Sequence, residues 1–278
     1  MSNVPSTKIP LDQARKVMVV LSGGQDSTYC LFYALRHFDE VHAVTFNYGQ
    51  RHSLELEAAR TVFDMAGDYY PDRIGSHEVC DIGPILQGTS PLVNKSSELE
   101  QYADHTVLPG GLEKTFVPMR NQLFLTLAAN RAFVKGAANL ITGVCEEDFG
   151  GYPDCRQVFI TSLEETCNLG TFTEEAGFPG GLNIWTPLMK MTKAATVLAA
   201  LELPGCYKAT AYSHTAYDGQ YPPIGHDHAT LLRAKGFIEA DIPDPLVLRA
   251  WSENLMDIPD TPNYRIELVR QYSELLDQ

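Results

Sequence analysis

Residues 17–27 read Val-Met-Val-Val-Leu-Ser-Gly-Gly-Gln-Asp-Ser, and the rest of the chain is organised around this stretch. Its apolar half predicts a buried strand over about 16–21, and the apolar spacing after it predicts a helix over about 26–37. Gly23 and Gly24 allow a ligand to approach the backbone closely, and Ser22 and Ser27 add hydroxyl groups. A turn of this composition that leads into a helix N-terminus is typical of an anion site, most often for phosphate.

The loop differs from the two commonest nucleotide-binding loops. It contains neither Gly-x-x-x-x-Gly-Lys-Ser/Thr nor Gly-x-Gly-x-x-Gly. The string Ser-Gly-Gly-Gln-Asp-Ser at 22–27 resembles the pyrophosphate loop of the ATP pyrophosphatases, which cleave ATP between the α and β phosphates and adenylylate an oxygen of their substrate. The alternative is a structural turn with a serine cap, which does not require all six residues.

Composition limits the class of protein. The chain has 278 residues, of which 44% are hydrophobic and 20% charged, and a formal net charge of −14, so nucleic acid is a poor candidate for its main partner. No apolar stretch approaches the length of a membrane span, and the first ten residues lack an apolar signal core. Six scattered cysteines without a Cys-x-x-Cys pair predict buried free thiols. We therefore expect a cytoplasmic protein.

Strands and helices alternate along the first two thirds of the chain. Further strands are predicted at about 41–46, 73–80, 139–144 and 183–186, with helices at about 52–65, 122–135, 157–169 and 192–201. This order predicts an α/β fold with a doubly wound, mostly parallel sheet and ligands at the carboxyl ends of its strands.

Two regions depart from that pattern. Residues 82–114 are rich in Gly, Pro, Ser and Asn and form a variable insert, which suggests a lid, an interaction loop or a disordered segment. We assign 1–201 to a nucleotide-binding domain and 202–278 to a C-terminal segment. Within that segment we expect loops over 202–230, a short helix over 230–236 and a closing helix over 264–276.

Four segments at expected strand ends or helix starts combine charged, aromatic and glycine residues: 47–52, 115–121, 143–156 and 186–193. They include Tyr-Gly-Gln-Arg-His at 48–52, Phe-Val-Pro-Met-Arg-Asn at 116–121 and Gly-Tyr-Pro-Asp-Cys-Arg at 151–156. With the loop at 22–27, these motifs resemble the 7-cyano-7-deazaguanine synthase (QueC) family in order and spacing over roughly 16–236.

The resemblance implies an activity. Enzymes of that family activate the carboxylate of 7-carboxy-7-deazaguanine with ATP, add ammonia to give the amide, and dehydrate the amide to the nitrile with a second ATP. Adenylylation is needed because a carboxylate lacks a good leaving group, and Mg²⁺ with cationic side chains spreads the charge of the departing pyrophosphate. The resemblance also implies a homodimer.

The candidate site residues form three groups. The catalytic candidates are Asp26, Arg120 and Lys193. The residues assigned to ATP are Leu21, Ser22, Gly23, Gly24, Gln25, Asp26, Ser27, Phe46, Arg120, Gly143 and Lys193. The residues assigned to the deazaguanine are Tyr48, Gln50, Arg51, Asp148, Tyr152 and Asp154.

Several of these assignments have alternatives. Lys193 contacts phosphate or is a solvated lysine at a helix start, and Asp26 holds Mg²⁺ or caps a helix. A carboxylate and an aromatic ring at 148–154 would match the donor-rich edge and the face of a deazaguanine, whereas the same residues also suit a solvated Gly-Pro turn. An adenylate route requires no thiol nucleophile, so we expect Cys145 and Cys155 to be structural.

One family feature is missing. The resemblance implies a structural zinc site of four cysteines, and here these positions are occupied by Ala216, Ile224, Asp227 and Thr230. Thiolate ligation is then excluded, and we expect no structural zinc. The apolar residues of the tail after 236 either cover this loop or form a surface for a partner protein, as residues 82–114 also could.

These departures leave two other functions open. A specialised relative could stop at the amide, or transfer the activated deazaguanine to another amine, including one on a protein. A non-catalytic adenine-nucleotide sensor would not need the complete loop together with the cationic candidates. The sequence favours the ligase.

Overall fold

The strands form one parallel sheet. The computed structural model describes residues 15–49, 54–83, 85–86, 88, 90–94, 100–101, 114–146, 152–216 and 219–277. Within them lies a five-stranded sheet in the order β3-β2-β1-β4-β5, in which every neighbouring pair is parallel. The strands are β1 (Lys16–Val20), β2 (Glu40–Asn47), β3 (Ile74–Asp81), β4 (Asn139–Ile141) and β5 (Asn183–Trp185). The predicted fold class is confirmed.

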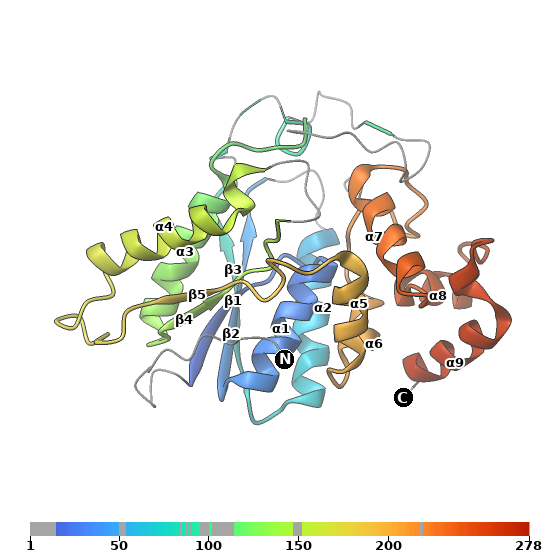
Figure 1. Ribbon diagram of the computed structural model, residues 1–278, viewed down its shortest axis with the longest axis horizontal. Coiled ribbons are helices and arrows are strands. Elements are labelled where there is room, and N and C mark those ends of the chain that lie inside the picture. Colours follow the sequence, from blue (N-terminus) through green and yellow to red (C-terminus); the bar gives the residue numbers. More distant parts are fainter. Residues whose placement is uncertain are drawn as a thin grey trace.

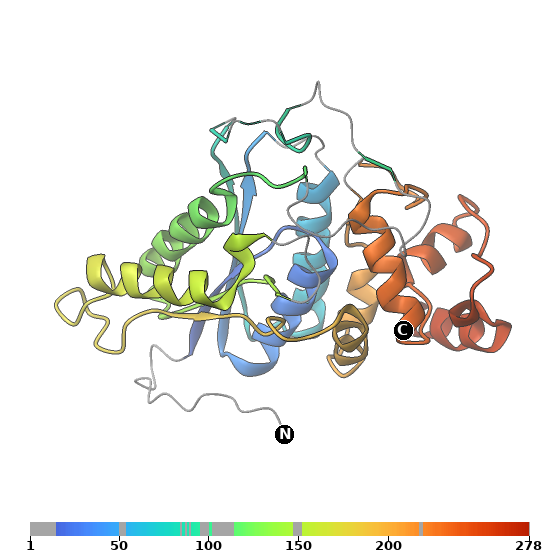
Figure 2. The same cartoon turned by 45° about the horizontal axis from the view of Figure 1, so that its top comes forward.

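Helices cover both faces of this sheet (Figures 1 and 2). One face carries α1 (Gln25–His37), α2 (Leu54–Tyr69), α5 (Lys193–Leu201) and α6 (Cys206–Thr210). The other face carries α3 (Arg120–Val134) and α4 (Gln157–Gly170). Because each crossover of a parallel sheet places a helix on one face, the apolar strands are buried on both sides.

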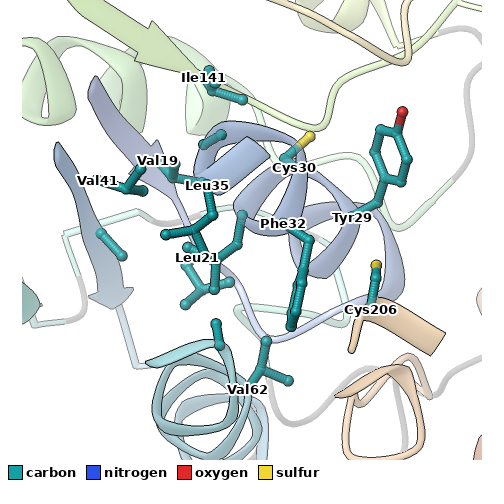
Figure 3. Close-up of a cluster of buried hydrophobic side chains, with 14 of the residues drawn as sticks. Val19, Leu21, Tyr29, Cys30, Phe32, Leu35, Val41, Val62, Ile141 and Cys206 are labelled. Atoms are coloured by element: carbon teal, nitrogen blue, oxygen red, sulfur yellow. The ribbon is translucent and has the colours of Figure 1, made fainter. Parts of the chain in front are cut away.

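The alternation of β1 divides its side chains between the two layers. Val19 and the following Leu21 pack with Phe32 and Leu35 of α1 (Figure 3), whereas Met18 belongs to the cluster beneath α3. Full burial of each such side chain stabilises the fold by roughly 1.5–3 kcal/mol. The sheet thereby holds the end of β1, where the glycine loop begins, in a rigid frame.

The site follows from the strand order. β1 pairs with β2 on one side and with β4 on the other, so the connections leaving β1 and β4 diverge to opposite faces of the sheet. Such a switch point leaves a crevice at the carboxyl ends of the strands. The loop at 22–27 and the segment after β4 meet at this crevice.

The C-terminal segment is more helical than predicted. It contains α6 where loops were expected, then α7 (His228–Glu239), α8 (Pro245–Ser252) and α9 (Ile266–Asp277). α6 has five residues, too few to show a periodicity, and α8 begins with an Asp244 cap followed by Pro245, a start signal that the prolines of this region concealed. Two short 3₁₀ helices, Pro153–Cys155 and Pro262–Tyr264, were also not predicted.

The tail packs on the body of the protein. Phe237 and Ile242 join Val197 and Tyr207 in a small apolar cluster, and α7 to α9 lie beside α5 and α6 (Figure 1). Much of the insert at 82–114 lies outside the described residues, but Ser90 is buried and donates a hydrogen bond to the Thr115 carbonyl at 2.9 Å. Among the described helices, none has the length and apolar character needed to cross a membrane.

Candidate active site

Hydrogen bonds made by its own serine side chains stabilise the conformation of the glycine loop. Ser27 Oγ donates to the Gly24 carbonyl at 3.0 Å, and the Ser22 amide donates to Ser27 Oγ at 3.2 Å. Gly23 has a φ of +88°, and a Cβ there would lie 2.3 Å from the Glu55 carbonyl oxygen. The N-cap of α1 is Gly24, so the serine-cap alternative is wrong. A glycine cap leaves the helix N-terminus accessible to an anion.

A cavity of about 260 Å³ opens beside this loop. The ends of β1, β2 and β4 form its base, and the first turns of α1, α2 and α3 form its walls. Among the sequence candidates, those that line it are Leu21, Ser22, Asp26, Ser27, Phe46, Tyr48, Arg120, Gly143 and Tyr152. The structure thus gathers residues from four distant segments of the chain into one site.

The remaining candidates lie elsewhere. Gly23 and Gly24 belong to the loop backbone, whereas Gln25 points toward Thr196 and Phe237, on the side of α5 and α7. Gln50, Arg51 and Asp148 fall outside the described residues, so their assignment to the substrate stays a prediction.

Lys193 and Asp26 form an ion pair at the edge of the cavity. Lys193 Nζ lies 2.7 Å from Asp26 Oδ2, and Lys193 is only 8% exposed, so the solvated-lysine alternative is wrong. α7 presses on this lysine at Gly236, where a Cβ would lie 2.6 Å from the Lys193 Cβ. Asp26 Oδ1 is buried and accepts no hydrogen bond from the described atoms. An unsatisfied carboxylate oxygen beside the glycine loop fits a hard cation such as Mg²⁺.

The segments 115–121 and 152–156 are joined by hydrogen bonds on the opposite side of the cavity. Asn121 donates from its backbone to Asp154 Oδ2 at 3.3 Å and from its side chain to the Asp154 carbonyl at 3.2 Å. Thr115 Oγ1 and the Tyr152 hydroxyl are 2.6 Å apart. Met119, at the N-cap of α3, has a strained φ of 64°, and Arg120 follows it directly. These contacts hold Arg120 at the cavity wall.

Asp154 lies behind this wall rather than on it. Its side chain is more than nine-tenths buried, and Oδ1 has no hydrogen-bond partner among the described atoms. Burial raises its pKa, while the Asn121 amide and the Arg120 charge oppose that rise. The solvated-turn alternative is wrong for Asp154, but its predicted contact with substrate is not tested by this arrangement.

The charge of Arg120 acts on several titratable side chains of the cavity. Its positive charge opposes the effect of burial on Tyr48, whose pKa is nevertheless raised to about 12. The same charge acts on Glu55, whose pKa burial raises to about 7. Burial raises the pKa of Cys155 to about 12, so this thiol stays protonated near neutral pH and is a poor nucleophile.

Sequence reasoning missed several cavity residues. They are Val20, Glu55, Asn121, Phe124, Thr142, Val144 and Cys155. Phe124 stacks on Phe46 with ring centres 4.8 Å apart and lies 5.1 Å from the ring of Tyr48. Its spacing of three from Asn121 on one helix was a usable signal, because residues three or four apart share a face. Nothing in the sequence separates Glu55 from Glu57 of the same turn.

The positions of the family's zinc cysteines have other contacts. The Asp227 carboxylate accepts hydrogen bonds from the Thr230 amide at 3.1 Å and from its hydroxyl at 3.0 Å, which caps α7. Ala216 is buried, and Ile224 is exposed. These side chains do not fit a tetrahedral thiolate zinc site.

The tail covers this loop. The guanidinium of Arg249 in α8 lies between the rings of Tyr212 and Tyr221, 4.3 and 4.5 Å from their centres. Arg249 Nη1 also donates to the Ala211 carbonyl at 3.3 Å. Of the two roles suggested for the tail, covering the altered loop is therefore the one supported by contacts.

The fold and the loop together define a doubly wound α/β protein with a Ser-Gly-Gly turn at its topological switch point. The profile of the family described as "Queuosine biosynthesis protein QueC" matches residues 16–241. The chain belongs to the QueC family, which confirms the resemblance carried by the motifs.

Curated relatives agree with this assignment. The chain is 49% identical to the 7-cyano-7-deazaguanine synthase of Gloeobacter violaceus, over 84% of this chain and 95% of that one. It is 44% identical to the enzymes of the same name from Chromobacterium violaceum and Laribacter hongkongensis, over 86% and 84% of this chain and 95% and 94% of theirs.

Two solved structures show a more remote likeness. The U34-tRNA thiolase NcsA from Methanococcus maripaludis is 14% identical, with a TM-score of 0.39 over 97% of this chain and 76% of the other. A 4-thiouridine synthetase bound to RNA and ATP is also 14% identical, with a TM-score of 0.43 over 95% of this chain and 53% of the other.

Proposed function

We propose that this protein is an ATP-dependent carbon–nitrogen ligase that converts 7-carboxy-7-deazaguanine to the amide and then to 7-cyano-7-deazaguanine. The observation that carries the proposal is one shared cavity, which the loop at 22–27 borders on one side and the aromatic residues Phe46, Tyr48 and Tyr152 border on the other. Relatives of 44–49% identity that bear the synthase name support the same substrate.

The loop serves ATP in this proposal. Its backbone N–H groups and serine hydroxyls receive the pyrophosphate, and Lys193 and Arg120 supply positive charge to the departing group. Leu21, Phe46 and Gly143 lie at the base of the cavity, where the nucleoside would bind. Asp26 would hold Mg²⁺, which neutralises charge on the phosphates.

The aromatic side of the cavity receives the base. Tyr48 and Tyr152 offer faces for stacking, and Gln50, Arg51, Asp148 and Asp154 complete the proposed substrate set. The substrate carboxylate attacks the α-phosphorus, and the bond to the pyrophosphate breaks. Ammonia then attacks the acyl carbon, and AMP leaves. In the second round the amide oxygen is adenylylated, and loss of AMP with protons from nitrogen gives the nitrile.

The setting of the protein follows from the same proposal. We expect a cytoplasmic enzyme that requires Mg²⁺ and forms a homodimer, with no nucleic acid as substrate. None of the cysteines among the described residues forms a disulfide, which suits a reducing compartment. Residues 82–114 or 237–278 could contact another protein, although Phe237 and Ile242 of the tail pack against this chain.

A mass-spectrometric assay tests the function. The protein is incubated with 7-carboxy-7-deazaguanine, ATP, Mg²⁺ and ammonia, and both the base and AMP are followed. Accumulation of nitrile with two AMP per base supports the proposal. A product that stops at the amide or adenylate favours the specialised relative, and binding of ATP without any AMP favours the sensor.

A further inference from the structure

Glu55 is a cavity residue to which no role has been assigned so far. It is the second residue of α2, and its side chain lines the cavity beside Ser22, Tyr48 and Arg120. The backbone of this turn rests directly on the glycine loop, because a Cβ on Gly23 would overlap the Glu55 carbonyl at 2.3 Å. The first turn of α2, which carries Glu55, therefore packs against the glycine loop.

The two described carboxylates of the cavity differ in their cationic partners. Among the described residues that line the cavity, the two carboxylates are Asp26 and Glu55. Asp26 Oδ2 accepts a hydrogen bond from Lys193 Nζ at 2.7 Å, so this carboxylate already has a cationic partner. Glu55 interacts with the charge of Arg120 across the cavity wall.

The other titratable groups facing this cavity stay protonated near neutral pH. They are Tyr48, Tyr152 and Cys155, and burial raises the pKa of each. Burial also raises the pKa of Glu55, to about 7, although the Arg120 guanidinium opposes the shift. A carboxylate with such a pKa gains and loses a proton readily at neutral pH, which suits a general base.

The proposed reaction has a step that needs such a base. Ammonia attacks the acyl adenylate, a C–N bond forms, the C–O bond to AMP breaks, and AMP leaves with the electron pair. The nitrogen then carries an excess proton, which must be removed. In the nitrile step an N–H proton is lost as the second AMP departs.

We propose that Glu55 is the general base that takes the proton from nitrogen in the amide-forming and nitrile-forming steps. This inference rests on the proposed ligase function. The proton moves from the nitrogen to the Glu55 carboxylate and from there to water, so neither an oxidant nor a further co-substrate is required. Arg120 stabilises the ionised form of Glu55 between turnovers.

The simpler explanation is that Glu55 only complements the dipole of α2, as an acidic residue in a first turn does. Glu57 provides the matched control because it lies in the same turn and is exposed to solvent. A dipole role would make Glu55→Gln and Glu57→Gln equivalent. A base role affects Glu55→Gln alone.

The test separates the two half-reactions in the full-length protein. Pyrophosphate release in a single turnover reports adenylylation, and the amide is followed by mass spectrometry. With Glu55→Gln we expect amide formation to fall by roughly 10²–10⁴-fold, the usual contribution of general base catalysis, with a much smaller effect on pyrophosphate release. Glu57→Gln should behave as wild type, and Glu55→Asp should recover part of the rate.

Two further measurements distinguish a base from a structural role. At a constant concentration of free NH3, wild-type amide formation should rise with pH and level off above about 7, because the base acts when deprotonated, and this limb should be absent in Glu55→Gln. Hydroxylamine is a neutral, stronger nucleophile near pH 7 and needs less help from a base. We therefore expect similar rates of hydroxamate formation in wild type and Glu55→Gln, which also shows that the variant is folded.

Each contrary result has a distinct meaning. If wild type makes amide and Glu55→Gln makes it at the same rate with the same pH profile, the ligase function stands and the base assignment is wrong. If Glu55→Gln loses both half-reactions equally and hydroxylamine does not restore the product, Glu55 has a structural or binding role. If wild type releases no pyrophosphate with the deazaguanine acid, the proposed function fails and the base assignment fails with it.

Discussion

The ion pair between Arg233 and Asp244 is a buried contact that links the tail to the loop at 210–215. Arg233 Nε and Nη2 donate to the two carboxylate oxygens of Asp244 at 2.6 and 2.8 Å, and the two side chains are 3% and 5% exposed. Arg233 Nη1 also donates to Ser213 Oγ at 2.8 Å and to Thr215 Oγ1 at 2.9 Å. Asp244→Asn would keep the shape and the cap of α8 while leaving the arginine charge buried and uncompensated.

The expected cost follows from that burial. Removal of one partner of a buried, hydrogen-bonded ion pair costs about 3–5 kcal/mol, because the remaining charge stays out of water. The unfolding equilibrium constant would rise by roughly 10² to 4 × 10³, since each 1.4 kcal/mol is tenfold. For a chain of this size the melting temperature should fall by about 6–20 °C.

The matched control is the ion pair between Arg265 and Asp241. Its N–O distance is also 2.6 Å, but both side chains are more than half exposed, at 53% and 54%. Asp241 has a φ of 55°, a conformation that asparagine tolerates, so Asp241→Asn removes the charge without new strain. An exposed pair contributes about 0–1 kcal/mol.

Thermal and urea unfolding of the two variants compare the stability contributed by the buried and the exposed ion pair. We expect a large shift for Asp244→Asn and a small one for Asp241→Asn, with unchanged urea m-values. Because the His214 amide donates to the Gly23 carbonyl at 2.8 Å, loosening 213–215 should also raise the KM for ATP. Equal shifts in the two variants, or a loss below about 1 kcal/mol for Asp244→Asn, would refute the argument that the buried pair holds the loop.

Three other predictions concern the site and the missing zinc. Gly23→Ala should lower AMP formation by roughly 100-fold, because the new Cβ displaces the loop from Glu55. The control Gly177→Ala has the same φ of +88° with no atom within 4 Å, and its rate of AMP formation should stay near that of the wild type. Equal rates in the two variants would contradict this account. Lys193→Gln should reduce kcat for ATP cleavage by roughly 10²–10³, and the exposed Lys190→Gln should not; an active Lys193→Gln enzyme would remove the lysine from the mechanism. Dialysis against EDTA should release no stoichiometric zinc, measured by plasma mass spectrometry, and should leave the melting temperature unchanged; a fall in melting temperature would show that a structural metal is present.

The sequence was most informative where structure is local. The strand β1 (Lys16–Val20), the glycine turn and the helix after it follow from apolar periodicity and turn chemistry over a few residues. The same rules missed α6, because five residues show no periodicity, and α8, because the Asp244-Pro245 start signal stood among other prolines. These local rules also missed Phe124 and Glu55 as cavity residues. A sequence pattern shows which side chains point inward, but it does not show whether they point into the core or into a cavity.

The sequence by itself determined the α/β order, the glycine loop before the first helix and the membership of the QueC family, because each is written in short motifs and in their spacing. Only the tertiary structure decided that Lys193 pairs with Asp26 across 167 residues, that Asn121 holds Asp154, and that Asp244 neutralises Arg233. These pairings depend on which elements pack together and on how far each charge is withdrawn from water. Local patterns carry little information about either quantity, because burial is a property of the assembled layers.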